Sequence, residues 1–81
     1  MEAMNLDLEP FIQHGHVIEL TGKTDIGARV MVNGREVPVI AADGSFRYFT
    51  PPLPAGENFI TITAQNAQGG VNTVQKKVVI Q

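Results

Sequence analysis

The sequence predicts an all-β fold built from short antiparallel strands. Apolar and polar residues alternate with a period of two through most of the 81 residues, and no segment has the 3.6-residue period of a helix. Val, Ile, Thr and Phe dominate the segments between turn signals, which recur roughly every 8–12 residues. This spacing is typical of a β-sandwich or a β-barrel.

Three strands are expected in the first part of the chain. Residues 5–9 alternate polar and apolar side chains, and Pro10 ends this strand because it has no N–H to donate to a ladder. Residues 17–23 form the second strand by the same alternation. Residues 24–27 have the composition of a turn and lead into a third strand at 28–32.

Two dipeptides, Asn33-Gly34 and Asp43-Gly44, are the strongest turn signals in the chain. Both favour a type I′ turn, which needs positive φ at its two central residues. They divide the sequence after the third strand into further strands at 36–41 and 45–50. The sequence therefore predicts a three-strand meander over residues 28–50, and the two dipeptides are interpreted as turns rather than as ligand loops.

Two-residue loops also predict the register of this meander. The first loop places Val30 opposite Val37, and the second places Val39 opposite Tyr48. Apolar residues are then paired on one face, as a core requires.

The second half of the chain supplies two more strands. Residues 51–54, Pro-Pro-Leu-Pro, lack three N–H donors and predict an extended crossover instead of a central strand. Strands are expected at 58–64 and 71–80, with a turn at 66–70 between them.

Lys76 conflicts with this pattern. Alternation back from Ile80 places Lys76 on the core side of the last strand, where a charged side chain needs an escape to solvent or a β-bulge. We expect a bulge or irregularity at 75–77. The predicted core comprises Ile18, Leu20, Val30, Phe46, Tyr48, Ile60, Ile62 and Val78.

The composition fits one small folded domain. It is 43% hydrophobic and 17% charged, which is too apolar and too weakly charged for a disordered chain. Residues 10–81 are expected to form a single domain, and residues 1–9 an N-terminal segment that contains the first strand. Met4, three residues after Met1, hints that the first residues were added ahead of the natural sequence.

Charge and hydropathy exclude several classes of partner. The net charge is −2 with six Lys and Arg residues, so the basic surface needed for nucleic acid is missing. No apolar run approaches the ~20 residues that span a bilayer, so membrane insertion is not expected. Cysteine is absent, which excludes disulfides and thiolate metal sites.

Six sequence pieces occur in a specific order and spacing. They are Gly22, Thr24-Asp25-Ile26-Gly27-Ala28, Val32-Asn33-Gly34, Asp43-Gly44-Ser45-Phe46, Gly56-Glu57-Asn58-Phe59-Ile60 and Ala64-Gln65-Asn66-Ala67-Gln68-Gly69. Through them, residues 16–80 resemble the small bacterial immunoglobulin-like modules of the glucodextranase domain-B type. Ile26 departs from the family, which usually has Pro there. Gln65 and Asn66 replace a more acidic loop, so no Ca²⁺ site is inferred.

The resemblance implies an immunoglobulin-like Greek-key β-sandwich of about seven antiparallel strands. It also implies a non-catalytic spacer or scaffold module of a larger secreted or cell-surface bacterial or archaeal protein. Its partners would be neighbouring domains of the same polypeptide or another protein, and the isolated domain would be an extracytoplasmic monomer without a cofactor.

The candidates for metal binding and catalysis are few. His14 and His16 have i, i+2 spacing, which places two imidazoles on one side of a strand, but a third ligand is missing nearby in the sequence. The alternative is a pair of surface histidines. Ser45, the only serine, lies in a turn and is remote from both histidines in the sequence, and the acidic residues are scattered singly. We therefore do not expect an enzyme.

A surface patch is the stronger functional candidate. If the predicted core residues point inward, a set of apolar and basic side chains on the meander points outward. The set comprises Arg29, Met31, Ile40, Arg47 and Phe49. One exposed apolar patch of this kind would mark a contact with another domain or protein. The alternatives are that loops cover these residues, or that they are isolated surface residues.

An aromatic ring beside Arg could also stack on a sugar. The second functional candidate is therefore a carbohydrate-binding accessory domain of a glycan-active enzyme, with Phe49 as its central residue.

Overall fold

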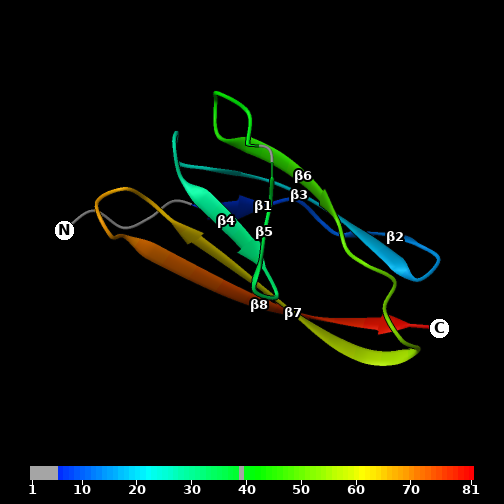
Figure 1. Cartoon of the computed structure of the whole chain (residues 1–81). Helices are drawn as coiled ribbons and strands as arrows, with labels where there is room; N and C mark the ends of the chain where they lie inside the picture. The colour runs from blue at the N-terminus through cyan, green and yellow to red at the C-terminus, as the bar shows by residue number, and fades with distance from the viewer. Residues whose placement is uncertain (1–5, 39) are drawn as a thin grey trace.

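The structure, a computed structural model, describes residues 6–38 and 40–81 and consists of two antiparallel β-sheets (Figure 1). The two sheets lie face to face with a shared apolar interior, and the described residues form no helix. The predicted all-β sandwich is confirmed. No described segment is a helix long and apolar enough to cross a membrane.

Sheet A contains β1 (Leu6–Leu8), β2 (Ile12–His14), β3 (Val17–Thr24) and β6 (Ser45–Phe49). β3 is central. β1 and β2 pair with opposite halves of one of its edges, and β6 pairs with the other edge. β1 thus extends the sandwich ahead of the boundary expected at residue 10, and β2 was not predicted. Met1–Met4 and residue 5 of the first predicted strand lie outside the described residues.

Sheet B contains β4 (Arg29–Val32), β5 (Arg35–Glu36), β7 (Gly56–Gln65) and β8 (Val71–Ile80) in the order β5-β4-β7-β8. The β7–β8 hairpin pairs without interruption over the whole length of both strands. β4 pairs with the C-terminal half of β7.

The turn at Asn33-Gly34 forms as predicted. Asn33 has φ 51° and Gly34 has φ 82°, as a type I′ turn requires. The Val37 N–H donates to the Val30 carbonyl at 2.8 Å, which confirms the predicted register. The Asn33 side chain also accepts from the Thr61 N–H at 2.8 Å, and this bond ties the turn to β7.

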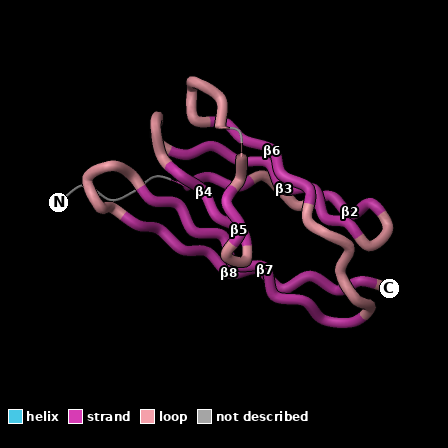
Figure 2. Tube along the Cα trace, in the orientation of Figure 1, coloured by secondary structure: helices cyan, strands magenta, loops and turns pink. Residues whose placement is uncertain are grey.

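The predicted three-strand meander is wrong after this turn. The Ala41 N–H donates to the Ser45 carbonyl, and the Gly44 N–H donates to the Ala41 carbonyl, so the loop has three residues instead of two. Gly44 has φ 91°, whereas Asp43 is not among the positive-φ residues. Of the described residues in the strand predicted at 36–41, Glu36 alone lies in a strand, the two-residue β5, and the chain then crosses to sheet A (Figure 2). The predicted Val39 pairings lie outside the described residues.

A glycine explains why β6 joins β3. Gly22 pairs with Leu8 of β1 and with Phe46 of β6. A Cβ atom at Gly22 would lie 2.6 Å from the Asp7 carbonyl oxygen and 2.9 Å from Cζ of Phe46. The absent side chain therefore leaves the space into which the Phe46 ring packs.

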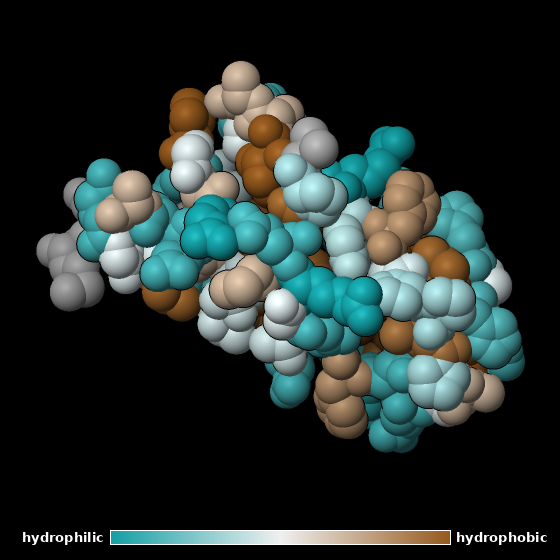
Figure 3. All heavy atoms as spheres, viewed as in Figure 1, coloured by the Kyte–Doolittle hydropathy of each residue, from teal (hydrophilic) through white to brown (hydrophobic). Residues whose placement is uncertain are grey.

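The core is the predicted one with additions. Six of the eight predicted residues are buried, and Tyr48 and Val78 are partly buried against them. The further buried apolar residues are Ala28, Val32, Val37, Ala64 and Ile80. Apolar atoms reach the surface only as small separate areas on the side seen in Figure 3.

The predicted irregularity at 75–77 is also wrong. Pairing runs continuously through Ile60↔Lys76, so Lys76 does occupy an inward position of β8. Its side chain is nevertheless exposed, because β8 is the last strand of its sheet and a long side chain can reach solvent around the edge. The escape to solvent, not the bulge, resolves the conflict.

Candidate interaction face

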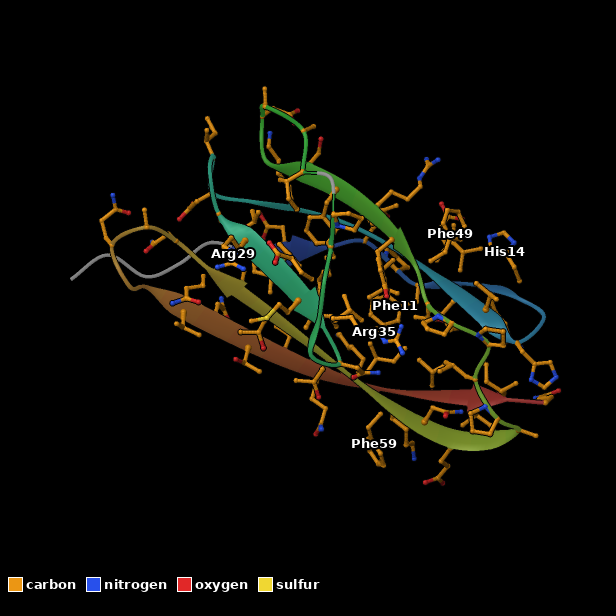
Figure 4. All side chains as sticks on the ribbon, viewed as in Figure 1. Phe11, His14, Arg29, Arg35, Phe49 and Phe59 are labelled. Carbon is orange, nitrogen blue, oxygen red and sulfur yellow. The ribbon has the colours of Figure 1, made fainter. Side chains whose placement is uncertain are left out.

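One area of the outer face of sheet A combines exposed apolar groups with a fixed polar network. We call it the Phe49 face, and it comprises Ile12, His14, Val17, Glu19, Arg47 and Phe49. These residues come from β2, β3 and β6. Phe49 and His14 lie side by side on the outer side of the sheet (Figure 4).

Strand register assembles the centre of this face. Glu19 pairs with Ile12 on one side and with Phe49 on the other, so the three side chains form a row across the sheet. Ile12 is 50% exposed and Phe49 is 51% exposed. With strands about 4.8 Å apart, the two apolar residues stand roughly 10 Å apart on either side of the carboxylate.

Both oxygens of the Glu19 carboxylate have a partner. His14 Nε2 lies 2.8 Å from Oε1, and Arg47 Nε lies 3.2 Å from Oε2. The Glu19 side chain is only 13% exposed, whereas those of His14 and Arg47 are more than half exposed. The His14 ring lies 6.2 Å from the Phe49 ring at a tilt of 47°. Glu19 therefore fixes the His14 and Arg47 side chains beside the exposed aromatic ring.

The structure does not assemble the predicted patch. Arg47 and Phe49 belong to the Phe49 face, but Arg29 and Met31 lie on β4, on the outer face of sheet B. Ile40 lies in the connection between the sheets and is packed against the core. The prediction assumed that β4 and β6 share one sheet, and their separation divides the set between opposite faces of the sandwich.

Arg29 has a partner of its own on sheet B. Its Nη2 and Nε donate to the Glu36 carboxylate at 2.8 and 3.1 Å. These hydrogen bonds, together with the attraction of opposite charges, lower the pKa of Glu36 and raise that of Arg29.

The two histidines point to different partners. Gly15, with φ 62°, and His16 form the turn between β2 and β3. His16 Nδ1 lies 2.7 Å from the Leu53 carbonyl, while His14 is bound to Glu19. Within residues 6–38 and 40–81, no three His, Cys, Asp or Glu side chains form a group that could hold a metal ion.

Polar groups in two hairpin loops hold the backbone. Asp43 Oδ1 accepts from the N–H and the hydroxyl of Ser45 at 3.0 and 2.6 Å, and these bonds lower the pKa of Asp43. Asn66 Oδ1 accepts from the N–H groups of Gln68 and Gly70. Ser45 pairs with Lys23 near the end of β3 that is opposite the histidines.

Sequence reasoning missed half of the Phe49 face. Ile12 and His14 were not placed on a strand, and Glu19 was treated as a scattered acid. Residues 11–14 read Phe-Ile-Gln-His and do not alternate, so period two gave no signal for this strand. No protein-family model matches the chain, and neither do the curated proteins or the solved structures.

Proposed function

We propose that this chain is a non-catalytic immunoglobulin-like module that acts as a spacer and contact domain in a larger secreted or cell-surface bacterial or archaeal protein. The sequence resemblance of residues 16–80 supports this assignment. The strand order adds support for a Greek key, because the chain changes sheets between β3 and β4, between β5 and β6, and between β6 and β7.

The observation that carries the contact role is the row across the Phe49 face. Half-exposed Ile12 and Phe49 flank a carboxylate that is already bonded at both oxygens. Protein contact surfaces are enriched in aromatic residues and Arg, and this face exposes Phe49 and Arg47 on the same strand. Because Glu19 is satisfied within the domain, covering it would not leave an unpaired charge. A neighbouring domain or another protein is the expected partner.

Hydroxyl-radical footprinting with mass spectrometry tests the contact role without any substitution. Phe49 and Phe59 are 51% and 57% exposed and lie on different sheets, so they form a matched pair. We expect oxidation of Phe49 to fall several-fold when the domain is part of the longer protein, whereas Phe59 stays unchanged. Equal oxidation of Phe49 in the domain and in the longer protein would refute a contact with a neighbouring domain of the same polypeptide.

A second candidate is carbohydrate binding by the same face. The exposed Phe49 ring has Arg47 on its strand and His14 beside it, so a sugar could stack on the ring and bond to the polar groups. A glycan array tests this role, with Phe49→Ala expected to abolish binding and Phe59→Ala expected to retain it. Failure to bind any glycan would eliminate this candidate and leave the contact module.

A further inference from the structure

A groove of about 490 Å³ opens at one edge of the sandwich, and none of the residues that line it belongs to the Phe49 face. One wall is formed by Leu8, Glu9, Pro10, Phe11 and Gln13, and the other by Lys76, Lys77 and Val78 of β8. Ile18, which is buried in the core, lies at its base. The groove therefore leads from solvent to the apolar interior between the two sheets.

At this groove, the edge of sheet A is interrupted, and the edge strand of sheet B has a neighbouring strand on one side. Pro10 separates β1 from β2, so the edge of sheet A is interrupted there. On the other side, residues 74–78 of β8 pair with β7 alone among the strands that the structure describes. A strand with one unpaired edge presents a row of N–H and C=O groups that can pair with another chain.

The charge of Lys76 favours an acidic ligand at this edge. It lies on the inward side of β8 between Val74 and Val78, and its side chain lines the groove. Lys77, on the outward side, lies 3.8 Å from Glu57, whereas no acidic group among the described residues forms an ion pair with Lys76. The groove is also lined by Glu9, on the opposite wall, so its two lysines outnumber its acidic residues. The Lys76 ammonium group beside apolar side chains fits a ligand that carries a carboxylate between apolar groups.

We propose that β8 accepts an extended segment of a partner protein as an added strand of sheet B. Backbone hydrogen bonds to β8 would provide affinity, and side chains at alternate positions would provide specificity. The fitting segment has apolar, acidic and apolar residues at alternate positions, so that they face Val74, Lys76 and Val78. A second copy of β8 fits poorly, since antiparallel pairing about the strand centre would bring the lysines of the two copies together.

A blocked peptide, Thr-Val-Thr-Glu-Thr-Val-Thr, is a suitable probe because one of its faces reads Val-Glu-Val. We expect titration of the ¹⁵N-labelled 81-residue domain to shift the amide signals of β8 and of Leu8, Glu9, Phe11 and Gln13. Lys76→Glu should weaken binding about tenfold, and a peptide with Lys in place of Glu should bind the Lys76→Glu variant better than the wild type. Arg35→Glu on β5, at the opposite edge of sheet B, is the matched control: it makes the same change of charge outside the groove and should change the affinity little.

Three results would overturn the added-strand proposal. They are an absence of β8 shifts at millimolar peptide, shifts centred on another surface such as the Phe49 face, and equal affinity of the wild type and Lys76→Glu. The proposal does not depend on the contact role of the Phe49 face, because the two surfaces share no residue and the footprinting experiment reports only on the latter.

Discussion

The two sheets of this domain are assembled in different ways. Sheet B contains the β7–β8 hairpin, whose two strands have ten residues each and are neighbours in the sequence. Sheet A is built from shorter strands, and its β3–β6 pairing joins segments that are separated by two strands of the other sheet. Sheet A therefore depends on a few positions where the backbone approaches closely, above all Gly22 and Gly44.

The outer faces of the sheets differ as well. On sheet B, the centre carries Thr and Gln side chains, with Thr63 and Thr73 hydroxyls 3.4 Å apart and Gln75 bonded to Thr61. On sheet A, the centre carries the Glu19 network between two exposed apolar residues. Exposed apolar residues occur on both outer faces, with Phe59, Val71 and Val79 on sheet B. Among the described residues, sheet A differs in placing a carboxylate that is bonded at both oxygens between two of them.

Alanine substitutions at Gly44 and Gly34 should give the largest difference in unfolding free energy between a turn that leads into sheet A and one within sheet B. Both residues have positive φ, 91° and 82°, so each variant loses about 1–2 kcal/mol from backbone strain. A Cβ atom at Gly44 would also clash with the Thr24 carbonyl oxygen, whereas one at Gly34 would meet open space. We expect Gly44→Ala to lose about 1–3 kcal/mol more, measured by urea unfolding. Equal losses would mean that this close approach does not limit sheet A.

Neutralising one acidic residue on each outer face should give the next largest change in unfolding free energy. Glu19→Gln removes the charge that binds both His14 and Arg47, so we expect a loss of about 1 kcal/mol in unfolding free energy. Glu36→Gln breaks a pair with Arg29 whose side chains are both largely exposed, so a smaller loss is expected. If Glu36→Gln were the more destabilising variant, the Glu19 network would not distinguish the faces.

Local signals predicted most of the strands but not their partners. The Asn33-Gly34 turn fixed its hairpin correctly, because both flanking strands stay in sheet B. Alternation also gave the inward faces of Phe46 and Tyr48, since the inward side of a strand is the same whichever sheet it joins. It could not reveal that β6 pairs with β3, because the partners are distant in the sequence and the Phe46 ring packs in a space that Gly22 leaves on β3.

The same limit explains the outcome for the surface. Phe49 and Arg47 were correctly expected to point outward, yet their neighbours were misassigned because β4 and β6 were placed in one sheet. Glu19 becomes the centre of the Phe49 face only through its pairing with β2 and β6. The arrangement of a site across strands is a tertiary property that period-two alternation does not contain.

Ile26→Pro tests the connection from sheet A to sheet B. The Ala28 N–H donates to the Asp25 carbonyl at 3.1 Å, and Gly27 has φ 79°, as expected for a type II turn, which favours Pro at the position of Ile26. Ile26 is 77% exposed, so little packing is lost. We expect a gain of about 0.4–1 kcal/mol in unfolding free energy relative to Ile26→Ala. A loss relative to that control would exclude this turn type.

The smallest effect is the pH dependence at the loop before β6. Hydrogen bonds from the Ser45 hydroxyl and N–H lower the pKa of Asp43 in the folded state. The ionised carboxylate therefore contributes stability above its unfolded pKa of about 3.9, and this contribution is lost as the pH falls through the lower folded pKa. Asp43→Asn keeps an oxygen acceptor for Ser45 but removes the charge.

Urea unfolding of the wild type and Asp43→Asn at neutral pH and again in strong acid measures this contribution. We expect the wild type to be slightly more stable at neutral pH and the difference to vanish in acid. Glu36 also has a lowered pKa, but it is present in both proteins and cancels in the difference. A difference in unfolding free energy that stays constant on acidification would show that Asp43 acts in this loop as a hydrogen-bond acceptor alone. Its charge would then contribute nothing to the stability of the connection between the two sheets.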